Sequence, residues 1–198
     1  IIDVSAITSI YRPGPLSAGV HDEYLEAKES PQYIRYLTDE SREITQETFG
    51  FLIFQEQIAL LANKPGGLTL DEGNMPRKVL TKKGTGKADV TDQLRIKFIN
   101  GCVDKGIKVD DASSLWNKFK YFSGYGFNKS HAVSYSVISF QCAWLWNYYP
   151  AEWMAAFLDK EPETRKEKAI NIAKQYGFDI APLDINKSGT VWEISDDG

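Results

Sequence analysis

Residues 125–149 read YGFNKSHAVSYSVISFQCAWLWNYY and contain the longest apolar stretch of the chain. Gly126 allows a tight turn, and Asn128 or Ser130 can cap the helix that follows. Serine, glutamine and asparagine residues interrupt the apolar stretch, which excludes a membrane span. Apolar residues still occur on all sides of this helix, so it must be covered on most of them. We therefore expect the longest buried helix of the chain at residues 129–146.

The composition is that of an ordinary folded protein. Apolar residues make up 42% of the 198 residues, and the net charge of −4 argues against a freestanding nucleic-acid binder. Cys102 and Cys142 form no CxxC pattern and no signal peptide is present, so we expect a reduced, cytoplasmic protein with no membrane partner. The chain starts at Ile1 and ends without an obvious terminal element, so we expect a piece of a longer protein.

Turn signals and apolar periodicity predict a mainly α fold with irregular or extended ends. Residues 3–10 are compatible with strand or helix, whereas RPGPL at 12–16 should break regular structure because it contains two prolines and a glycine. The tail beyond Ile180 looks extended, so we expect a helical domain over residues 1–180 and an extended lead into another domain over 181–198. Further helices are expected at 51–63, 74–80, 90–103, 110–122 and 164–176, the last capped by Gly177, and residues 24–28 are compatible with a short helix or an irregular piece.

A basic segment, NMPRKVLTKK, occupies residues 74–83. Its cations are Arg77, Lys78, Lys82 and Lys83. Lys78 and Lys82 are four residues apart and share a helix face, where like charges repel each other unless an anion lies between them. A triphosphate or a DNA backbone would serve as that anion. The alternative is a solvated basic face without a ligand.

The start of the long helix is the second candidate site. Asn128, Lys129 and Ser130 precede His131, and Tyr135 follows one turn later on the same face. A helix N-terminus favours anions and can present free N–H groups to a phosphate, while a flat ring one turn further can stack on a base. The alternative is a tyrosine in the core beside a structural histidine.

Other chemistries fit less well. GTGK at residues 84–87 hints at a phosphate loop, but the Walker pattern needs glycine at the position of Thr81 and serine or threonine at that of Ala88. His21 and His131 have no metal-ligand spacing, so no zinc site is expected.

Two glutamines flank a glutamate at the start of an apolar run. Glu56 lies between Gln55 and Gln57, where a structural hydrogen-bonding role fits better than acid–base catalysis. Arg12, in the rigid turn at 11–16, is either a phosphate contact or part of a connector.

In this order, the segments resemble one family, the C-family bacterial replicative DNA polymerases, whose members form the alpha subunit of DNA polymerase III. The resemblance covers essentially the whole chain, and YGFNKSHA is its most specific motif. The matching pieces are YRPGPL (11–16), TFG (48–50), FQEQ (54–57), RK (77–78), KK (82–83), YGFNKSHA (125–132), YPAEWMAA (149–156) and PLDIN (182–186).

The resemblance implies the fingers region of a DNA-directed DNA polymerase, a nucleotidyltransferase. It implies binding of the incoming deoxynucleoside triphosphate (dNTP) and of template-primer DNA, beside the polymerase palm and thumb, with a sliding clamp bound through regions outside the chain. In the family the palm carboxylates hold the catalytic Mg²⁺ ions and precede the RPGPL motif. We therefore expect no catalytic and no metal-binding residue in this chain.

The resemblance also implies which residues meet the substrates. The nucleotide-binding residues would be Arg77, Lys78, Lys82, Lys83, Asn128, Lys129, Ser130, His131 and Tyr135. Contacts to DNA, or structural contacts, would come from Arg12, Phe127, Gln55 and Gln57.

The chain departs from the family pattern at four positions. Lys78 stands where a second arginine is common, Thr81 where glycine is common and Trp146 where lysine is common, and Pro76 replaces a helix former. These departures indicate a divergent member, from a bacterium or a bacteriophage. The competing interpretation of the whole chain is a non-catalytic helical interaction module without nucleotide contact.

We predict that the isolated chain has no polymerase activity, because two metal ions about 4 Å apart must be held by carboxylates, which the resemblance places in the palm and outside this chain. Primer extension with Mg²⁺ and all four nucleotides measures this directly. Template-dependent extension by the purified chain would contradict the prediction.

Overall fold

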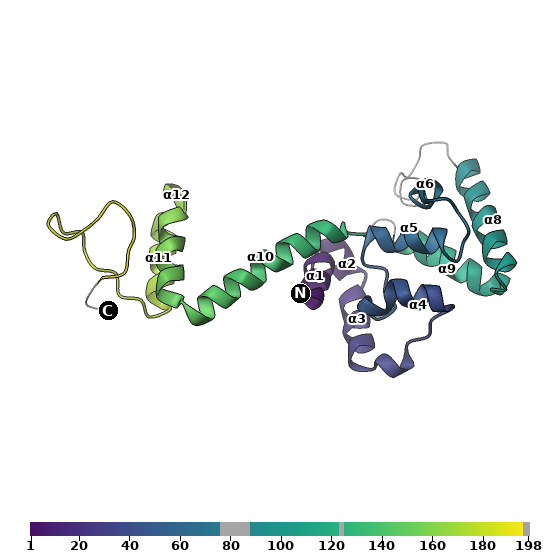
Figure 1. Cartoon of the computed structure of the whole chain (residues 1–198), viewed down its shortest axis with the longest axis horizontal. Coiled ribbons are helices and arrows are strands. Elements are labelled where there is room, and N and C mark those ends of the chain that lie inside the picture. Colours follow the sequence, from purple (N-terminus) through teal and green to yellow (C-terminus); the bar gives the residue numbers. More distant parts are fainter. Residues whose placement is uncertain (76–87, 123–124, 196–198) are drawn as a thin grey trace. The chain divides into compact units, whose positions relative to one another are not determined.

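The computed structural model describes residues 1–75, 88–122 and 125–195 (Figure 1). Within these ranges the regular structure is helical, and the one β-type pairing is an isolated parallel bridge between Phe54 and Phe127, so the mainly α prediction is confirmed. Contacts divide the chain into a first unit, Ile1–Val137, and a second unit, Ile138–Gly198. The division predicted between residues 180 and 181 stays a prediction.

The first unit contains most of the helices. They are α1 (Ile2–Ile10), α2 (Pro13–Ser17), α3 (Val20–Glu29), η1 (Pro31–Tyr33), α4 (Asp39–Thr45), η2 (Gln46–Thr48), α5 (Gln55–Asn63), α6 (Leu70–Gly73), α8 (Ala88–Asp104) and α9 (Val109–Phe122). The unit boundary falls inside α10 (Lys129–Tyr148), and the second unit continues with α11 (Pro150–Lys160) and α12 (Glu163–Gln175).

The proline-rich segment at residues 12–16 was expected to break regular structure, but it does not. Residues 13–17 form the short helix α2, with Pro13 in its first turn and Arg12 as its N-cap residue. A proline is tolerated there because the first N–H groups of a helix have no partner within the helix. The segment before the turn is the helix α1, which settles the choice between strand and helix.

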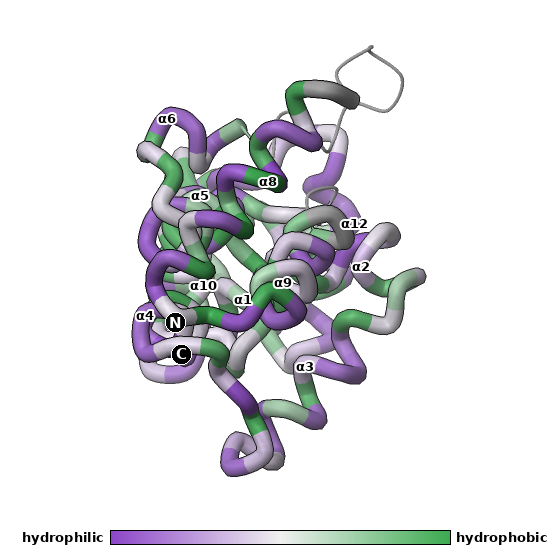
Figure 2. Tube along the Cα trace, turned by 90° about the vertical axis from the view of Figure 1, so that its right-hand side faces the viewer, coloured by the Kyte–Doolittle hydropathy of each residue, from purple (hydrophilic) through white to green (hydrophobic). Residues whose placement is uncertain are grey.

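The core of the first unit is built on aromatic rings from α8 and α9. Phe98 lies 5.4 Å from Trp116 and 5.2 Å from Phe119 between ring centroids, and all three side chains are buried. Phe54, Ile58 and Leu61 bring α5 into the same core. Hydrophobic and hydrophilic residues alternate along α8, as Figure 2 shows, in keeping with a helix that has one face in the core.

Two glycines allow a close approach to α8. A Cβ on Gly101 would collide with the carbonyl oxygen of Gly66, and a Cβ on Gly66 would collide with the ring of Phe98. The turn after α5 therefore lies directly against the backbone of α8, which no larger residue at position 101 would permit.

The second unit has its own small core. Met154 and Leu158 of α11 are buried with Ala169 and Ala173 of α12. Gly177 follows α12 with a φ of +87°, as its predicted role at the end of this helix requires. The tail beyond Ile180 contains no regular element up to residue 195.

The long helix is present, but the prediction that it is buried is wrong for the described chain. Only Ala132 and Ser136 of α10 are buried, whereas Ile138 is 52% exposed and Phe140 is 54% exposed. The apolar pattern indicates surface that needs to be covered. The described residues bury α10 fully only at Ala132 and Ser136, and Trp146 near its end packs partly against the core of the second unit. No helix among the described residues is both long and apolar enough to cross a membrane.

We predict that Gly101→Ala destabilises the chain by about 1–3 kcal/mol because the new methyl group overpacks the contact with Gly66. In an ordinary helix interior the same change would stabilise the protein by about 1 kcal/mol. The sign of the change in the free energy of unfolding therefore shows whether Gly101 is in tight contact with Gly66. Urea unfolding followed by circular dichroism measures the change. The control is Asn100→Ala at the exposed neighbouring position, which should leave stability within about 0.5 kcal/mol; a stabilising Gly101→Ala would contradict the packing.

Candidate functional site

The start of α10 is joined to the start of α5 by backbone pairing. The N–H of Phe127 donates to the carbonyl of Ile53 at 2.9 Å, and the N–H of Gln55 donates to the carbonyl of Phe127 at 2.9 Å. The Gln55 side chain adds a bond from Nε2 to the carbonyl of Gly126 at 2.7 Å. Three hydrogen bonds therefore fix the chain immediately before α10 to residues 53–55.

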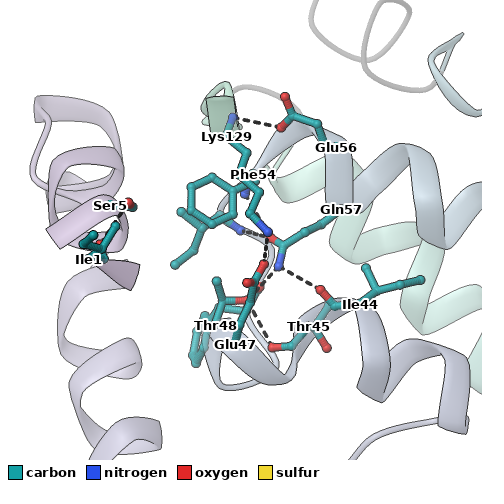
Figure 3. A network of polar contacts seen from close by, with 12 residues as sticks. Ile1, Ser5, Ile44, Thr45, Glu47, Thr48, Phe54, Glu56, Gln57 and Lys129 are labelled. Carbon is teal, nitrogen blue, oxygen red and sulfur yellow. Dashed lines mark hydrogen bonds and ion pairs between the residues drawn. The ribbon is translucent and has the colours of Figure 1, made fainter. Parts of the chain in front are cut away.

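Gln57 holds the other side of this junction (Figure 3). Its Oε1 accepts from the N–H groups of Ile53 and Phe54, both at 2.9 Å. Its Nε2 donates to the carbonyl of Ile44 at 3.2 Å and to Oγ1 of Thr48 at 2.7 Å. Because Gln57 is only 2% exposed, its amide serves the fold. Gln55 and Gln57 thus make structural contacts, one of the two roles that the sequence left open.

Glu56 binds the N-terminus of α10. Its carboxylate accepts from Nδ2 of Asn128 at 2.9 Å and from the backbone N–H of Lys129 at 3.0 Å. Oδ1 of Asn128 in turn accepts from the N–H of His131 at 2.9 Å and from the hydroxyl of Ser130 at 2.7 Å. The expected structural role of Glu56 is confirmed.

This arrangement engages backbone N–H groups at the start of α10. A helix start can offer free N–H groups to a phosphate, but here internal oxygen atoms accept the N–H groups of Lys129 and His131. The favourable end of the helix dipole already faces the carboxylate of Glu56. A phosphate that binds at this helix start therefore needs nearby cations to offset the charge of Glu56.

Lys129 is also engaged within the protein. Its ammonium forms an ion pair with Glu47 and lies 5.6 Å from the centre of the Phe54 ring. The side chains of Lys129 and Glu47 are 40% and 29% exposed, so water screens the pair and its contribution to stability is small. The positive charge is balanced but remains accessible.

His131 and Tyr135 form the exposed part of the site. Their ring centroids are 4.7 Å apart, and the ring of Phe127 lies 5.6 Å from that of His131. Tyr135 is 56% exposed, so in the described chain it does not pack in the core. The prediction that both rings share one face near the helix start is confirmed, whereas Arg77, Lys78, Lys82 and Lys83 lie outside the described residues.

Arg12 ties the end of α1 to the turn before α10. Its Nε donates to the carbonyl of Ser9 at 2.8 Å, its guanidinium donates to the carbonyl of Tyr125, and it lies 4.9 Å from the centre of the Phe127 ring. Partial burial lowers the pKa of Arg12. The ordinary pKa of a guanidinium lies so far above neutral that the group still carries its charge at pH 7. Arg12 and Phe127 thus make structural contacts with each other.

Two contacts of the site could not be read from spacing. Glu47, the partner of Lys129, stands 82 residues earlier in the chain. Ser5 of α1 donates to the hydroxyl of Ser136 at 2.9 Å in a buried contact that joins residues 131 positions apart. Pairs this distant leave no local pattern in a single sequence.

Residues 1–106 match the family model described as the bacterial DNA polymerase III alpha subunit finger domain. The chain belongs to the DNA polymerase III alpha subunit family. The alpha subunit of Aquifex aeolicus is 37% identical over 97% of this chain and 16% of its own length. Those of Borreliella burgdorferi and Escherichia coli K12 are 34% and 31% identical over 100% and 99% of this chain, and over 17% of their own lengths.

The chain therefore spans about one sixth of the length of these alpha subunits. The YGFNKSHA motif at residues 125–132, which contains His131, lies beyond residues 1–106 that the finger-domain model matches. Within residues 1–75, 88–122 and 125–195, no three His, Cys, Asp or Glu side chains are grouped so that they could hold a metal ion.

We predict that Arg12→Ala destabilises the chain by about 1.5–3 kcal/mol, because it removes hydrogen bonds from a charged donor to two buried or half-buried carbonyls. Arg12→Lys should recover only part of the loss, since an ammonium lacks the fork of the guanidinium. Urea unfolding measures both variants. Arg35→Ala, at an exposed position, is the control, and an Arg12→Ala protein as stable as that control would contradict the structural role.

Proposed function

We propose that this chain is the fingers segment of a DNA-directed DNA polymerase and contacts the incoming dNTP and the template-primer during nucleotidyl transfer. The family membership supports the polymerase assignment, since the curated relatives are named DNA polymerase III subunit alpha. The observation that carries the nucleotide contact is the exposed His131–Tyr135 pair on a helix start that is fixed by internal hydrogen bonds.

The two kinds of group in the site would divide the nucleotide between them. The rings of His131 and Tyr135 offer a stacking surface for a base or sugar. The triphosphate needs several cations, because one lysine in water contributes little. Arg77, Lys78, Lys82 and Lys83 would supply these charges, and Ser130 would add a hydroxyl. Lys129 joins them when a triphosphate, with its higher charge, takes the place of Glu47.

The remaining parts of the reaction belong to other regions of the polymerase. In this proposal the palm carboxylates hold two Mg²⁺ ions outside the chain, and the thumb and palm enclose the template-primer. A sliding clamp would bind through other regions, and the site of action is the cytoplasm. Residues 1–180 would form the fingers and residues 181–198 the lead into the next domain.

One observation favours the competing function, a helical interaction module. In the second unit, α10 exposes large apolar side chains, among them Ile138, Phe140 and Tyr148. Such surface is typical of protein–protein contacts. It concerns a different part of α10 from the His131–Tyr135 pair, so the two functions are separable by mutation.

We predict that, in a polymerase containing this segment, Tyr135→Ala impairs nucleotide incorporation by about tenfold, because loss of base stacking costs about 1–3 kcal/mol. Binding of primer-template should stay largely intact. Steady-state kinetics with each dNTP and a binding titration with duplex DNA measure the two effects. Tyr135→Phe is the matched control and should keep most of the activity, since it keeps the ring.

We predict further that Arg77→Ala mainly weakens nucleotide use, by roughly ten- to a hundredfold, because a lost charge-assisted contact costs about 1.5–3 kcal/mol. The same kinetics measure it, and the Michaelis constant for dNTP should carry most of the change. Unchanged nucleotide kinetics in both Arg77→Ala and Tyr135→Ala, with the fold preserved, would defeat the nucleotide-contact proposal and favour the interaction module.

A further inference from the structure

A chain of polar contacts runs from α5 to the exposed rings of α10. Glu56 accepts from the side-chain amide of Asn128, and Asn128 accepts from the N–H of His131. The His131 ring then contacts the ring of Tyr135, at 4.7 Å between centroids. One carboxylate is therefore connected, through Asn128, to both rings of the site.

Glu56 is well placed to act as an anchor. It lies in the first turn of α5 and accepts the first N–H of α10, so the positive ends of two helix dipoles face the same carboxylate. Its neighbours hold it in place, because Gln57 is buried in the hydrogen-bond network and Gln55 is bonded to the chain before α10. Figure 3 shows Glu56 reaching from α5 toward Lys129.

The amide of Asn128 depends on this carboxylate for its orientation. Only with Nδ2 toward Glu56 does Oδ1 point toward the N–H of His131. An Asn128 without that acceptor can rotate, and the first turn of α10 then loses its cap. His131 and Tyr135 both stand within the first two turns of α10, so they would move with it.

We propose that Glu56 is a positioning residue for nucleotide use: it touches no substrate, but it fixes the start of α10 so that the His131 and Tyr135 rings hold one geometry. This inference rests on the proposed function of those rings. A small misplacement of groups that orient a substrate lowers the rate of reaction even when binding persists.

The test uses a polymerase that contains this segment, with Glu56→Ala, Glu56→Gln, Tyr135→Ala and the double variant Glu56→Ala with Tyr135→Ala. Glu56→Ala should lower kcat/KM for dNTP by about three- to tenfold, with primer-template binding unchanged. Glu56→Gln should restore part of the loss, because one amide oxygen can still accept a hydrogen bond. The matched control is Glu43→Ala. Glu43 lies on α4, where its carboxylate forms an exposed ion pair with Lys64, and its loss should not change the kinetics.

The double variant separates positioning from general loss of stability. If Glu56 acts through the rings, Glu56→Ala should add less than about twofold to the effect of Tyr135→Ala, because residues in one network are not additive. Hydrogen exchange should also accelerate at the amides of Lys129 and His131 in Glu56→Ala and not at those of α8.

Two results would overturn the inference and can be told apart from failure of the proposed function. Full activity in Glu56→Ala, or an undiminished effect of Glu56→Ala in the Tyr135→Ala background, contradicts the positioning role alone. If Tyr135→Ala leaves nucleotide use unchanged, the ring contact on which the inference rests is absent and the inference fails. The proposed function fails only if Arg77→Ala also leaves nucleotide use unchanged. Should Glu56→Ala not fold, an activity of Glu56→Gln equal to that of Glu43→Ala in the same kinetics would also contradict the role.

Discussion

The pairing of residues 53–55 with Phe127 is the constraint on which the candidate site depends. A two-residue parallel bridge has little stability of its own, so it persists because side chains on both sides complete it. Gln57 satisfies the N–H groups of Ile53 and Phe54 from within the core, and Glu56 satisfies Asn128 and Lys129 from the surface. The start of α10 is in this way attached to the hydrophobic core of the first unit.

This attachment separates residues with structural roles from residues that remain available to a ligand. Asn128 and the backbone of Lys129 are engaged with Glu56, although the YGFNKSHA motif alone gives them the same standing as His131. His131 stands in the attached turn and Tyr135 in the next one, and Tyr135 stays more than half exposed. A motif can therefore be specific for a family while only some of its residues are free to meet substrate.

The sequence predicts what depends on neighbours in the chain. The helices α8, α9 and α12, and the glycine cap at Gly177, follow from periodicity and turn chemistry. The helix at residues 13–17 was missed because a proline at a first helical position was interpreted as a break. The prediction that α10 is buried was wrong, because the distribution of apolar residues shows which faces of a helix need to be covered but not whether the same chain covers them. The pairs Lys129–Glu47 and Gln57–Thr48 require knowledge of the fold.

The most direct measurement is a structure of a polymerase containing this segment, bound to primer-template DNA and a non-hydrolysable incoming nucleotide. The central claim is that the start of α10, held by Glu56, presents its rings to the nucleotide. We expect the base or sugar of the nucleotide within about 4 Å of the Tyr135 ring, with the Glu56–Asn128 bond retained. A nucleotide bound elsewhere, with Tyr135 covered by another part of the protein, would contradict the claim.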